Sequence, residues 1–283
     1  MVKKIFINKN AFDNKTKVKS LTKELKFKAG VVQFDIKSGQ IEANLNTALG
    51  YLEKLACDGV NLAVLPEMFS CSFDNKNLKQ HSKLTGKVLE KLSLFAKENQ
   101  MAIAGTLPEK EKDQIFNTMV FIERDGKIKA RYRKLHLFRL TDEHLYYTAG
   151  NEIAVIDSSF GRIGLMTCYD LRFPELARRL LMKGVKMIIV SAQWPESRKE
   201  HWKTLIKARA IENQLFMVCS NRTGEDDDLK FPGMSMIVDP MGSILTEARD
   251  KDACVYDHVD LGLVKDARAL IPCMEDRRDD LYG

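Results

Sequence analysis

Three chemically reactive side chains stand directly after apolar runs in this 283-residue sequence. Glu67 follows "LAVLP", Lys134 follows "KIKARYR", and Cys168 follows "RIGLMT". Apolar runs of this length are typical of strands, and the carboxyl ends of parallel strands open onto one crevice of an α/β fold. We therefore expect the three side chains to meet, although each alone could be a helix-capping acid, a surface lysine or a core thiol.

A glutamate, a lysine and a cysteine brought together can cleave a carbon–nitrogen bond. A thiol is a poor nucleophile until it loses its proton, so a neighbouring carboxylate can act as the base and later return the proton to a departing amine. An ammonium group between them favours the thiolate and stabilises the oxyanion of a tetrahedral intermediate. The set predicts a hydrolase that works through a thioester and needs no metal or organic cofactor.

Cys168 occupies a predicted strand-to-helix turn. The run "FGRIGLM" reads as a strand, and the helix after the cysteine has Leu176, Leu180 and Leu181 on one face and ends at Gly184. Unpaired N–H groups at a helix N-terminus would stabilise a thiolate and could hold an oxyanion. The alternative is a small buried hydrophobe, because free cysteines are among the most buried residues.

Short apolar runs alternate with amphipathic helices along both halves of the chain. Strand patterns occupy residues 29–34, 60–67, 101–107, 117–122, 127–134, 160–167, 186–194 and 215–221. Helical stripes are carried by Leu45, Leu49, Leu52 and Leu55, by Val88, Leu92 and Phe95, and by residues 201–214. Hairpin turns are predicted at Asp125-Gly126 and at 240–242.

Continuous apolar strands with helices between them favour two sheets packed together and covered by helices. This is an α/β fold with a four-layer α-β-β-α sandwich. No linker rich in Pro, Gly or Ser interrupts the chain after the first residues. We predict one domain over residues 28–283, preceded by a lysine-rich N-terminal extension at residues 1–27.

Charge and composition exclude several classes of partner. The formal net charge of +6 is concentrated in the first 28 residues, which hold nine lysines against Asp13 and Glu24. The rest of the chain is close to neutral, which argues against nucleic acid. No stretch reaches the ~20 apolar residues of a membrane span. The apolar patch "IFI" is too short for a signal peptide, so we expect no membrane partner and no export.

The six cysteines and five histidines show no pattern typical of a disulfide framework or a metal site. There is no C-x-x-C pair and no H-x-x-x-H spacing. We therefore expect no metal, reduced thiols and a cytoplasmic location.

The segments "LPEMF", "YRKLHLF" and "CYDLRFPEL" resemble the three signature blocks of the nitrilase superfamily, the carbon–nitrogen hydrolases, in the family's order. The similarity extends from about Lys28 to the C-terminal "DLYG". It implies an α-β-β-α sandwich, a small-molecule amide substrate, and a homodimer or higher homo-oligomer. It also implies that the segment "IPCMEDRRDDLYG" reaches across the dimer.

The resemblance also implies roles for individual residues. Glu67 corresponds to the general base, Lys134 to the oxyanion-stabilising lysine and Cys168 to the nucleophile. The backbone N–H of Tyr169 would complete the oxyanion hole. Glu143 matches a second glutamate that the family places beside the lysine and the substrate, with an exposed loop acid as the alternative.

Other segments resemble the bacterial omega-amidase branch, which hydrolyses the terminal amide of 2-oxoglutaramate or 2-oxosuccinamate. They are "HLFRLTDEH", "AQWPESRKEHWKTLIKARAIENQ" and "NRTG". Arg172 and Arg139 would clamp the substrate carboxylate, because guanidinium groups bind carboxylates in bidentate fashion. Arg172 could instead pair with Asp170 or Glu175. The residues expected to line the pocket beside them are Gln193 and Trp194.

Three alternatives stay open. The same machinery serves other branches of the superfamily, which act on a deaminated glutathione amide or an N-carbamoyl amino acid. Nitrile hydrolysis is less favoured, because many members with these blocks are amidases. A thiol redox sensor belongs to a different class, but a sensor needs a nearby resolving thiol and has no use for a paired glutamate and lysine.

Overall fold

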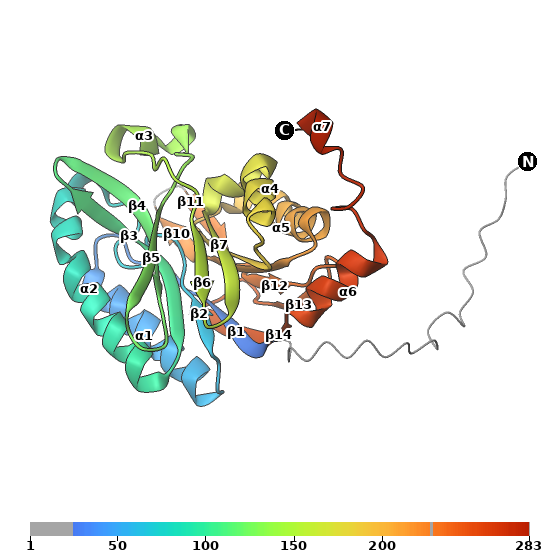
Figure 1. Ribbon diagram of the computed structural model, residues 1–283. Coiled ribbons are helices and arrows are strands. Elements are labelled where there is room, and N and C mark those ends of the chain that lie inside the picture. The colour runs from blue at the N-terminus through green and yellow to red at the C-terminus, as the bar shows by residue number, and fades with distance from the viewer. Residues whose placement is uncertain (1–24, 227–228, 283) are drawn as a thin grey trace, which may run out of the picture.

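The computed structural model describes residues 25–226 and 229–282, and it contains two six-stranded sheets packed against each other. Helices cover the outer face of each sheet, so the layers follow the order α-β-β-α (Figure 1). The predicted four-layer sandwich is confirmed. Most of the predicted N-terminal extension, residues 1–24, lies outside the described residues.

The first sheet presents the ends of two of its strands on the same side. It consists of β1 (Lys26–Gln33), β2 (Leu62–Val64), β3 (Ala102–Glu111), β4 (Gln114–Ile122), β5 (Ile128–Arg133) and β14 (Ala253–Asp260), in the order β14-β1-β2-β3-β4-β5. Strands β1, β2 and β3 run parallel, and two antiparallel steps turn β5 back into their direction. The residues that follow β2 and β5 therefore reach one edge.

The second sheet has the same kind of parallel centre. It consists of β6 (Val155–Ser158), β7 (Gly161–Thr167), β8 (Met187–Ala192), β9 (Phe216–Asn221), β12 (Met236–Val238) and β13 (Ile244–Glu247), in the order β13-β12-β9-β8-β7-β6. Strands β7, β8 and β9 are parallel. A separate hairpin joins β10 (Thr223–Asp226) to β11 (Leu229–Pro232).

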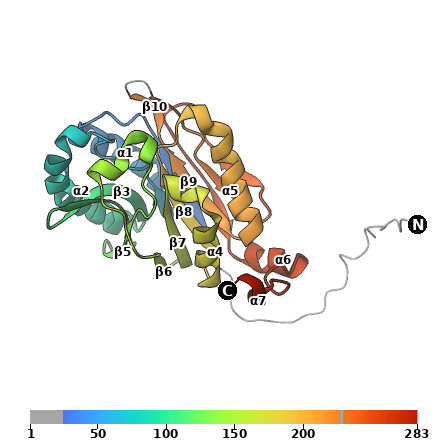
Figure 2. The same cartoon turned by 90° about the horizontal axis from the view of Figure 1, so that it is seen from above.

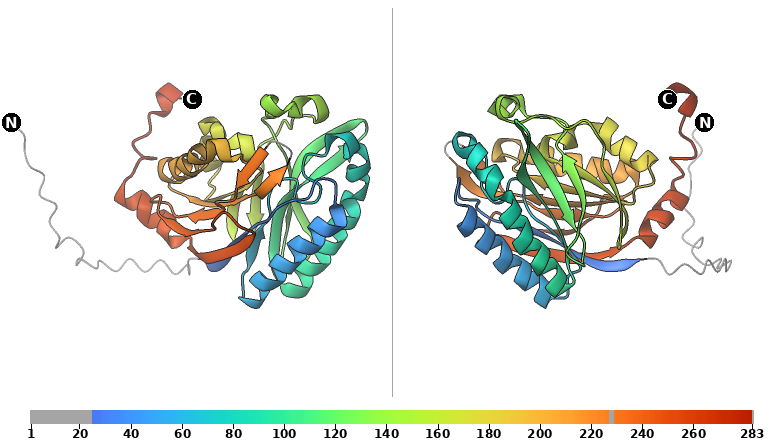
Figure 3. Two further views of the ribbon diagram at one scale, coloured as in Figure 1. Left: turned by 180° about the vertical axis from the view of Figure 1, so that it is seen from behind. Right: turned by 60° about the vertical axis from the view of Figure 1, so that its left-hand side comes forward.

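The long helices form the two outer layers, as the view from above shows (Figure 2). Helices α1 (Ile41–Cys57) and α2 (Leu78–Asn99) lie side by side over the first sheet, whereas α4 (Pro174–Met182) and α5 (Lys199–Asn213) cover the second (Figure 3). Helix α1 buries Leu45, Leu52 and Leu55 at the predicted helical spacing. The remaining helices and turns are α3 (Glu143–Tyr146), α6 (Gly262–Leu270), α7 (Asp279–Tyr282), η1 (Asn75–Asn77), η2 (Arg139–Thr141), η3 (Cys168–Arg172) and η4 (Glu196–Arg198).

A layer of apolar side chains between the sheets fixes their separation. It includes Val31 and Val64 from the first sheet and Ile163, Ile189 and Val218 from the second, all fully buried. Burying one such side chain stabilises the fold by about 1.5–3 kcal/mol relative to exposure. This layer holds the ends of β2 and β5 opposite the end of β7.

Both predicted hairpin turns are confirmed. Strands β4 and β5 are joined through Asp125-Gly126, and β12 and β13 through the turn at Gly242. Both glycines have the positive φ that such tight turns require, +80° and +83°. Among the described residues, no helix is both long enough and apolar enough to cross a membrane.

Candidate active site

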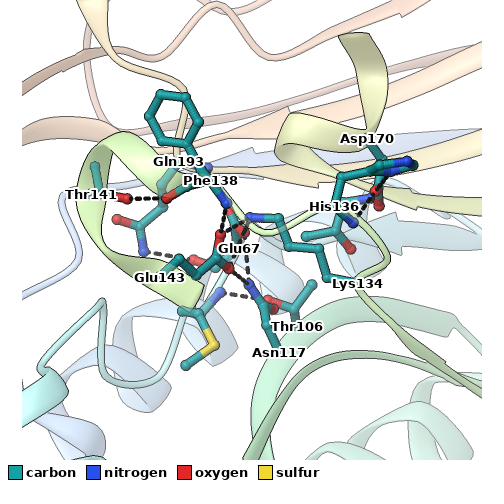
Figure 4. Close-up of polar contacts among 12 residues, drawn as sticks. Glu67, Thr106, Asn117, Lys134, His136, Phe138, Thr141, Glu143, Asp170 and Gln193 are labelled. Carbon is teal, nitrogen blue, oxygen red and sulfur yellow. Dashed lines mark hydrogen bonds and ion pairs between the residues drawn. The ribbon is translucent and has the colours of Figure 1, made fainter. Parts of the chain in front are cut away.

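The ends of β2, β5 and β7 bring a glutamate, a lysine and a cysteine to one cavity. Glu67 lies in the loop after β2, Lys134 directly follows β5, and Cys168 directly follows β7. The Lys134 ammonium Nζ lies 2.9 Å from Glu67 Oε1, and both side chains are buried (Figure 4). Cys168 lines the same cavity as this ion pair.

Glu143, from α3, forms the second ion pair of Lys134. Lys134 Nζ lies 2.9 Å from Glu143 Oε1 and 2.8 Å from Oε2. The backbone N–H of Phe138 also donates to Glu143 Oε2 over 2.7 Å. Glu143 is only 2% exposed, so it is not an exposed loop acid.

Two amide side chains hold the glutamates in place. Asn117 Nδ2, from β4, donates to Glu67 Oε1 (2.8 Å) and to Glu143 Oε1 (3.2 Å). The backbone N–H of Gln193 donates to Glu67 Oε2 (2.9 Å), and its Nε2 donates to the Glu67 carbonyl (2.8 Å). Sequence reasoning missed Asn117, and the available signal was a lone amide residue inside the apolar run "IFNTMVFI".

Burial and the two carboxylates set the charges of the site. Burial opposes the charge of Lys134, but Glu143 and Glu67 more than compensate and raise its pKa well above the ordinary value. Burial raises the pKa of Glu67, against the charge of Lys134 and with a further increase from Glu143. Lys134 is therefore a permanent cation, whereas Glu67 can gain and lose a proton closer to neutral pH.

Cys168 lies between β7 and α4, on the strand-to-helix turn that its neighbouring sequence predicts. The 3₁₀ turn η3 separates it from α4, because Pro174 begins α4 and leaves Phe173 extended. The cysteine has a φ of +44°, an uncommon conformation for a residue with a side chain. Burial and the charge of Glu67 raise the pKa of its thiol well above the ordinary value, and Lys134 opposes this. These effects favour the protonated thiol, so a base must generate the thiolate. Stabilisation of that thiolate by the N–H groups of the turn stays a prediction.

The cavity has a volume of about 110 Å³ and a largely apolar surface that includes several aromatic side chains. Glu67, Lys134, Glu143 and Cys168 line it together with Gln193. The aromatic residues of the wall are Phe73, Phe138, Tyr169, Trp194 and Phe231. Gln193 and Trp194 line this cavity, and so does Tyr169. The oxyanion role of the Tyr169 backbone N–H stays a prediction.

Two arginines complete the wall without a carboxylate partner among the described residues. The Arg172 guanidinium lies 4.6 Å from the centre of the Trp194 ring, and that of Arg198 lies 5.5 Å from the centre of the Phe138 ring. Burial lowers the pKa of Arg172, and the like charge of Arg198 lowers it further. Arg172 forms neither of the salt bridges, to Asp170 or to Glu175, that were the alternative for it.

Arg139 does not reach the cavity. It is exposed in η2, whereas Phe138 and Thr141 line the wall on either side of it. Residues three apart share a face in a 3₁₀ turn, so the side chains of Arg139 and Leu140 between them point away from that face. Arg198, which sequence reasoning missed, is the second arginine of the wall, and no pattern distinguished it from the other basic residues of that segment.

Within the two described ranges, no group of three or more His, Cys, Asp or Glu side chains is arranged to hold a metal ion.

The chain is similar to known proteins over most of its length. A model of the family "carbon-nitrogen hydrolase" matches residues 28–269. The chain is 36% identical to the 2-oxoglutaramate amidase of Bacillus subtilis, over 91% of this chain and 100% of that protein. It is 30% identical to the omega-amidase NIT2 of Homo sapiens, over 91% of this chain and 97% of that protein. The crystal structure of a carbon–nitrogen hydrolase superfamily protein from Xanthomonas campestris superimposes with a TM-score of 0.85, at 30% identity, over 92% of this chain and 100% of that one.

Proposed function

The chain belongs to the carbon–nitrogen hydrolase family, and on this premise we propose that it is an omega-amidase. It hydrolyses the terminal amide of a small carboxylate-bearing amide of the 2-oxoglutaramate type and releases ammonia. Similarity to proteins named 2-oxoglutaramate amidase and omega-amidase, at 30% to 36% identity over most of the chain, supports this choice of branch.

The first half of the reaction forms a thioester. Glu67 takes the proton of the Cys168 thiol, and the thiolate attacks the amide carbon. The resulting oxyanion is stabilised by the Lys134 ammonium and by the backbone N–H of Tyr169, since the first N–H groups of a helical turn lack partners within the turn. Glu67 then gives its proton to the departing nitrogen, and ammonia leaves.

The second half hydrolyses the thioester. Glu67 takes a proton from a water molecule, and the hydroxide oxygen attacks the thioester carbon. The second oxyanion occupies the same site beside Lys134, and it collapses to the free acid as the thiol regains its proton. Glu143 holds the Lys134 ammonium in position, and Asn117 holds the Glu67 carboxylate, through both halves of the reaction.

The observation that carries the proposed substrate is the pair of arginines in the cavity wall, which have no carboxylate partner among the described residues. Arg172 and Arg198 each lie over an aromatic ring, and no carboxylate of the described residues neutralises them. Two like charges held together in an apolar wall favour an anionic ligand, and guanidinium groups suit carboxylates. A substrate with a carboxylate at one end and an amide at the other spans from these arginines to Cys168.

The test is ammonia release from 2-oxoglutaramate, beside glutamine, an N-carbamoyl amino acid, a simple nitrile and uncharged butyramide. We expect turnover of 2-oxoglutaramate above all others, and none with Cys168→Ala. In Arg172→Gln and Arg198→Gln, loss of a charge-assisted hydrogen bond should raise KM for 2-oxoglutaramate about tenfold to a hundredfold. The matched control is Arg139→Gln, which removes an exposed arginine outside the cavity and should leave KM unchanged.

Turnover of the N-carbamoyl amino acid or the nitrile instead would keep the thioester chemistry and overturn the choice of branch. Arginine variants that impair butyramide as much as 2-oxoglutaramate would show that the pair does not bind the substrate carboxylate.

We also propose that the protein is cytoplasmic and a homodimer or higher homo-oligomer. All six cysteines are unpaired, which suits a reducing compartment. Exposed apolar side chains gather near the C-terminus, which suits a contact with a second copy. Localisation by fluorescence microscopy and light scattering of the purified protein test the two statements.

A further inference from the structure

One buried carboxylate lies between the two sheets beside the cavity and takes no part in the proposed reaction. Asp170, in η3, is fully buried. Its Oδ2 accepts hydrogen bonds from the Tyr132 hydroxyl (2.6 Å) and the Thr167 N–H (2.9 Å). Its Oδ1 accepts from the His136 N–H (3.0 Å) and lies 2.7 Å from His136 Nδ1.

These partners bracket the lysine and the cysteine. Tyr132 and His136 stand two residues before and two residues after Lys134, on the strand end of the first sheet. Thr167 directly precedes Cys168 and Asp170 follows it by two residues, on the strand end of the second sheet. Figure 4 shows Asp170 and His136 next to one another, on the opposite side of Lys134 from Glu143.

The chemistry of this contact requires a carboxylate. An ionised carboxylate is a pure acceptor with room for four donors, and these four contacts fill it. Burial and Asp170 raise the pKa of Tyr132 well above the ordinary value, so its phenol remains a donor. The His136 ring is held by stacking on Phe173, with 3.7 Å between the ring centres. An asparagine at this position would direct its NH₂ group at one pair of these donors, and that contact would be repulsive.

We propose that Asp170 is a positioning residue that sets the distance between the Lys134 ammonium and the Cys168 thiol. It ties the strand end that carries the lysine to the turn that carries the cysteine. This inference rests on the catalytic roles in the proposed function, but it does not depend on which amide is the substrate.

The Asp170 contact affects the reaction by fixing the position of Cys168 relative to Lys134. Lys134 is also held by Glu67 and Glu143, which belong to its own half of the site. Among the described residues, no side chain of the second sheet forms an ion pair or a hydrogen bond with Cys168, which has a φ of +44°. Without Asp170 the turn would move relative to Lys134 and Glu67. A shift of about 1 Å in a reacting group can reduce a rate about a hundredfold.

The experiment compares Asp170→Asn and Tyr132→Phe with the parent enzyme, on the best amide substrate and well below the temperature of unfolding. We expect kcat to fall about a hundredfold in Asp170→Asn. In Tyr132→Phe, which removes one neutral hydrogen bond, kcat should fall about threefold to tenfold. In both variants kcat should change more than KM. The double variant should lose less than the product of the two single effects, because both act on one contact.

A stability control separates positioning from general damage. Leu52→Ala removes a fully buried side chain on α1, in the layer opposite η3, and should lower Tm while kcat of the folded enzyme stays unchanged. If Asp170→Asn behaves like Leu52→Ala, the inference is wrong. If Asp170→Asn does not fold, Tyr132→Phe decides, and an unchanged kcat in that folded variant overturns the inference. Retained activity in Cys168→Ala would instead overturn the proposed function itself.

Discussion

At the centre of the site two carboxylates share one ammonium group. Glu143 contacts the Lys134 ammonium through both of its oxygens, whereas Glu67 contacts it through one. The Lys134–Glu143 pair is therefore close to neutral in total charge. Glu67 is left as the carboxylate whose proton can move, and it accepts further hydrogen bonds from Asn117 and Gln193. This arrangement suits a general base.

The raised pKa of Glu67 predicts the pH dependence of the reaction. A base must be ionised, so kcat/KM should fall as the pH drops through the pKa of Glu67. Burial, with a contribution from Glu143, raises that pKa, so the midpoint of the acidic limb should lie above the ordinary value of about 4.3. In Glu143→Gln one negative neighbour is lost, so the midpoint should move to lower pH. Normalised pH profiles of kcat/KM test this, and a midpoint that stays fixed or rises in Glu143→Gln contradicts it.

At this scale the sequence indicates which residue types meet, but not which neighbours hold them. The positions of Glu67, Lys134 and Cys168 after apolar runs were enough to expect them in one cavity. Asn117 escaped notice because only the register of β4 shows that its side chain points between the two glutamates. Arg198 escaped notice because the direction of a side chain in a short 3₁₀ turn depends on what packs against it. The prediction that Arg139 lies in the cavity wall was wrong for the same reason.

Among the structural elements, the loop that returns from α3 supports the end of β5. The Gly150 N–H donates to the Lys134 carbonyl over 2.8 Å. A Cβ atom at Gly150 would collide with the backbone oxygen of Arg133, which a side chain could not relieve by moving. The close approach of these two backbone segments therefore requires a glycine.

Gly150→Ala should displace the strand end that carries Lys134. Overpacking of this kind costs about 1–3 kcal/mol of stability, and the shift of Lys134 should also lower kcat. Urea unfolding and steady-state kinetics measure the two effects. The control is Gly50→Ala in α1, where a Cβ meets nothing within 4 Å, and it should stabilise the protein by up to about 1 kcal/mol with kcat unchanged. Equal behaviour of the two variants would contradict the supporting role of the loop.

Fully buried strands are easier to predict from the sequence than half-buried ones. Strands β8 and β9 are buried along their full length, and their continuous apolar runs identify them. Strand β14 escaped the sequence analysis because its side chains are mostly half-buried and form no apolar run, although it pairs with all of β1. Pro174 marks the start of α4 in the sequence, whereas the 3₁₀ conformation of η3 has no such sequence signal.

In the whole molecule, neither sheet contains a complete site. Glu67, Lys134 and Glu143 follow or lie near strands of the first sheet, and Cys168 follows a strand of the second. The apolar layer between the sheets and the Asp170 contact therefore decide whether the nucleophile faces its base. Similar strand orders in the two sheets allow both to present parallel strand ends toward the same cavity.

The C-terminal segment of the described chain exposes several large apolar side chains to solvent. Leu270, Ile271, Leu281 and Tyr282 are 49% to 70% exposed, and a groove of about 530 Å³ separates α7 from α4. Figure 1 shows α7 standing away from the sheets. Exposed apolar side chains of this size indicate a contact surface, and we assign it to the second copy in the proposed homodimer.

If this segment reaches the second copy, the double variant Leu281→Ser with Tyr282→Ser should weaken the dimer without unfolding either copy. We expect light scattering to show a dimer for the parent protein and a shift toward monomer, at low micromolar concentration, for the variant. The control is Leu94→Ser on α2, which changes a side chain 57% exposed elsewhere on the surface and should leave the mass unchanged. A parent protein that is monomeric, or a variant that remains as dimeric as the control, would show that these side chains face solvent.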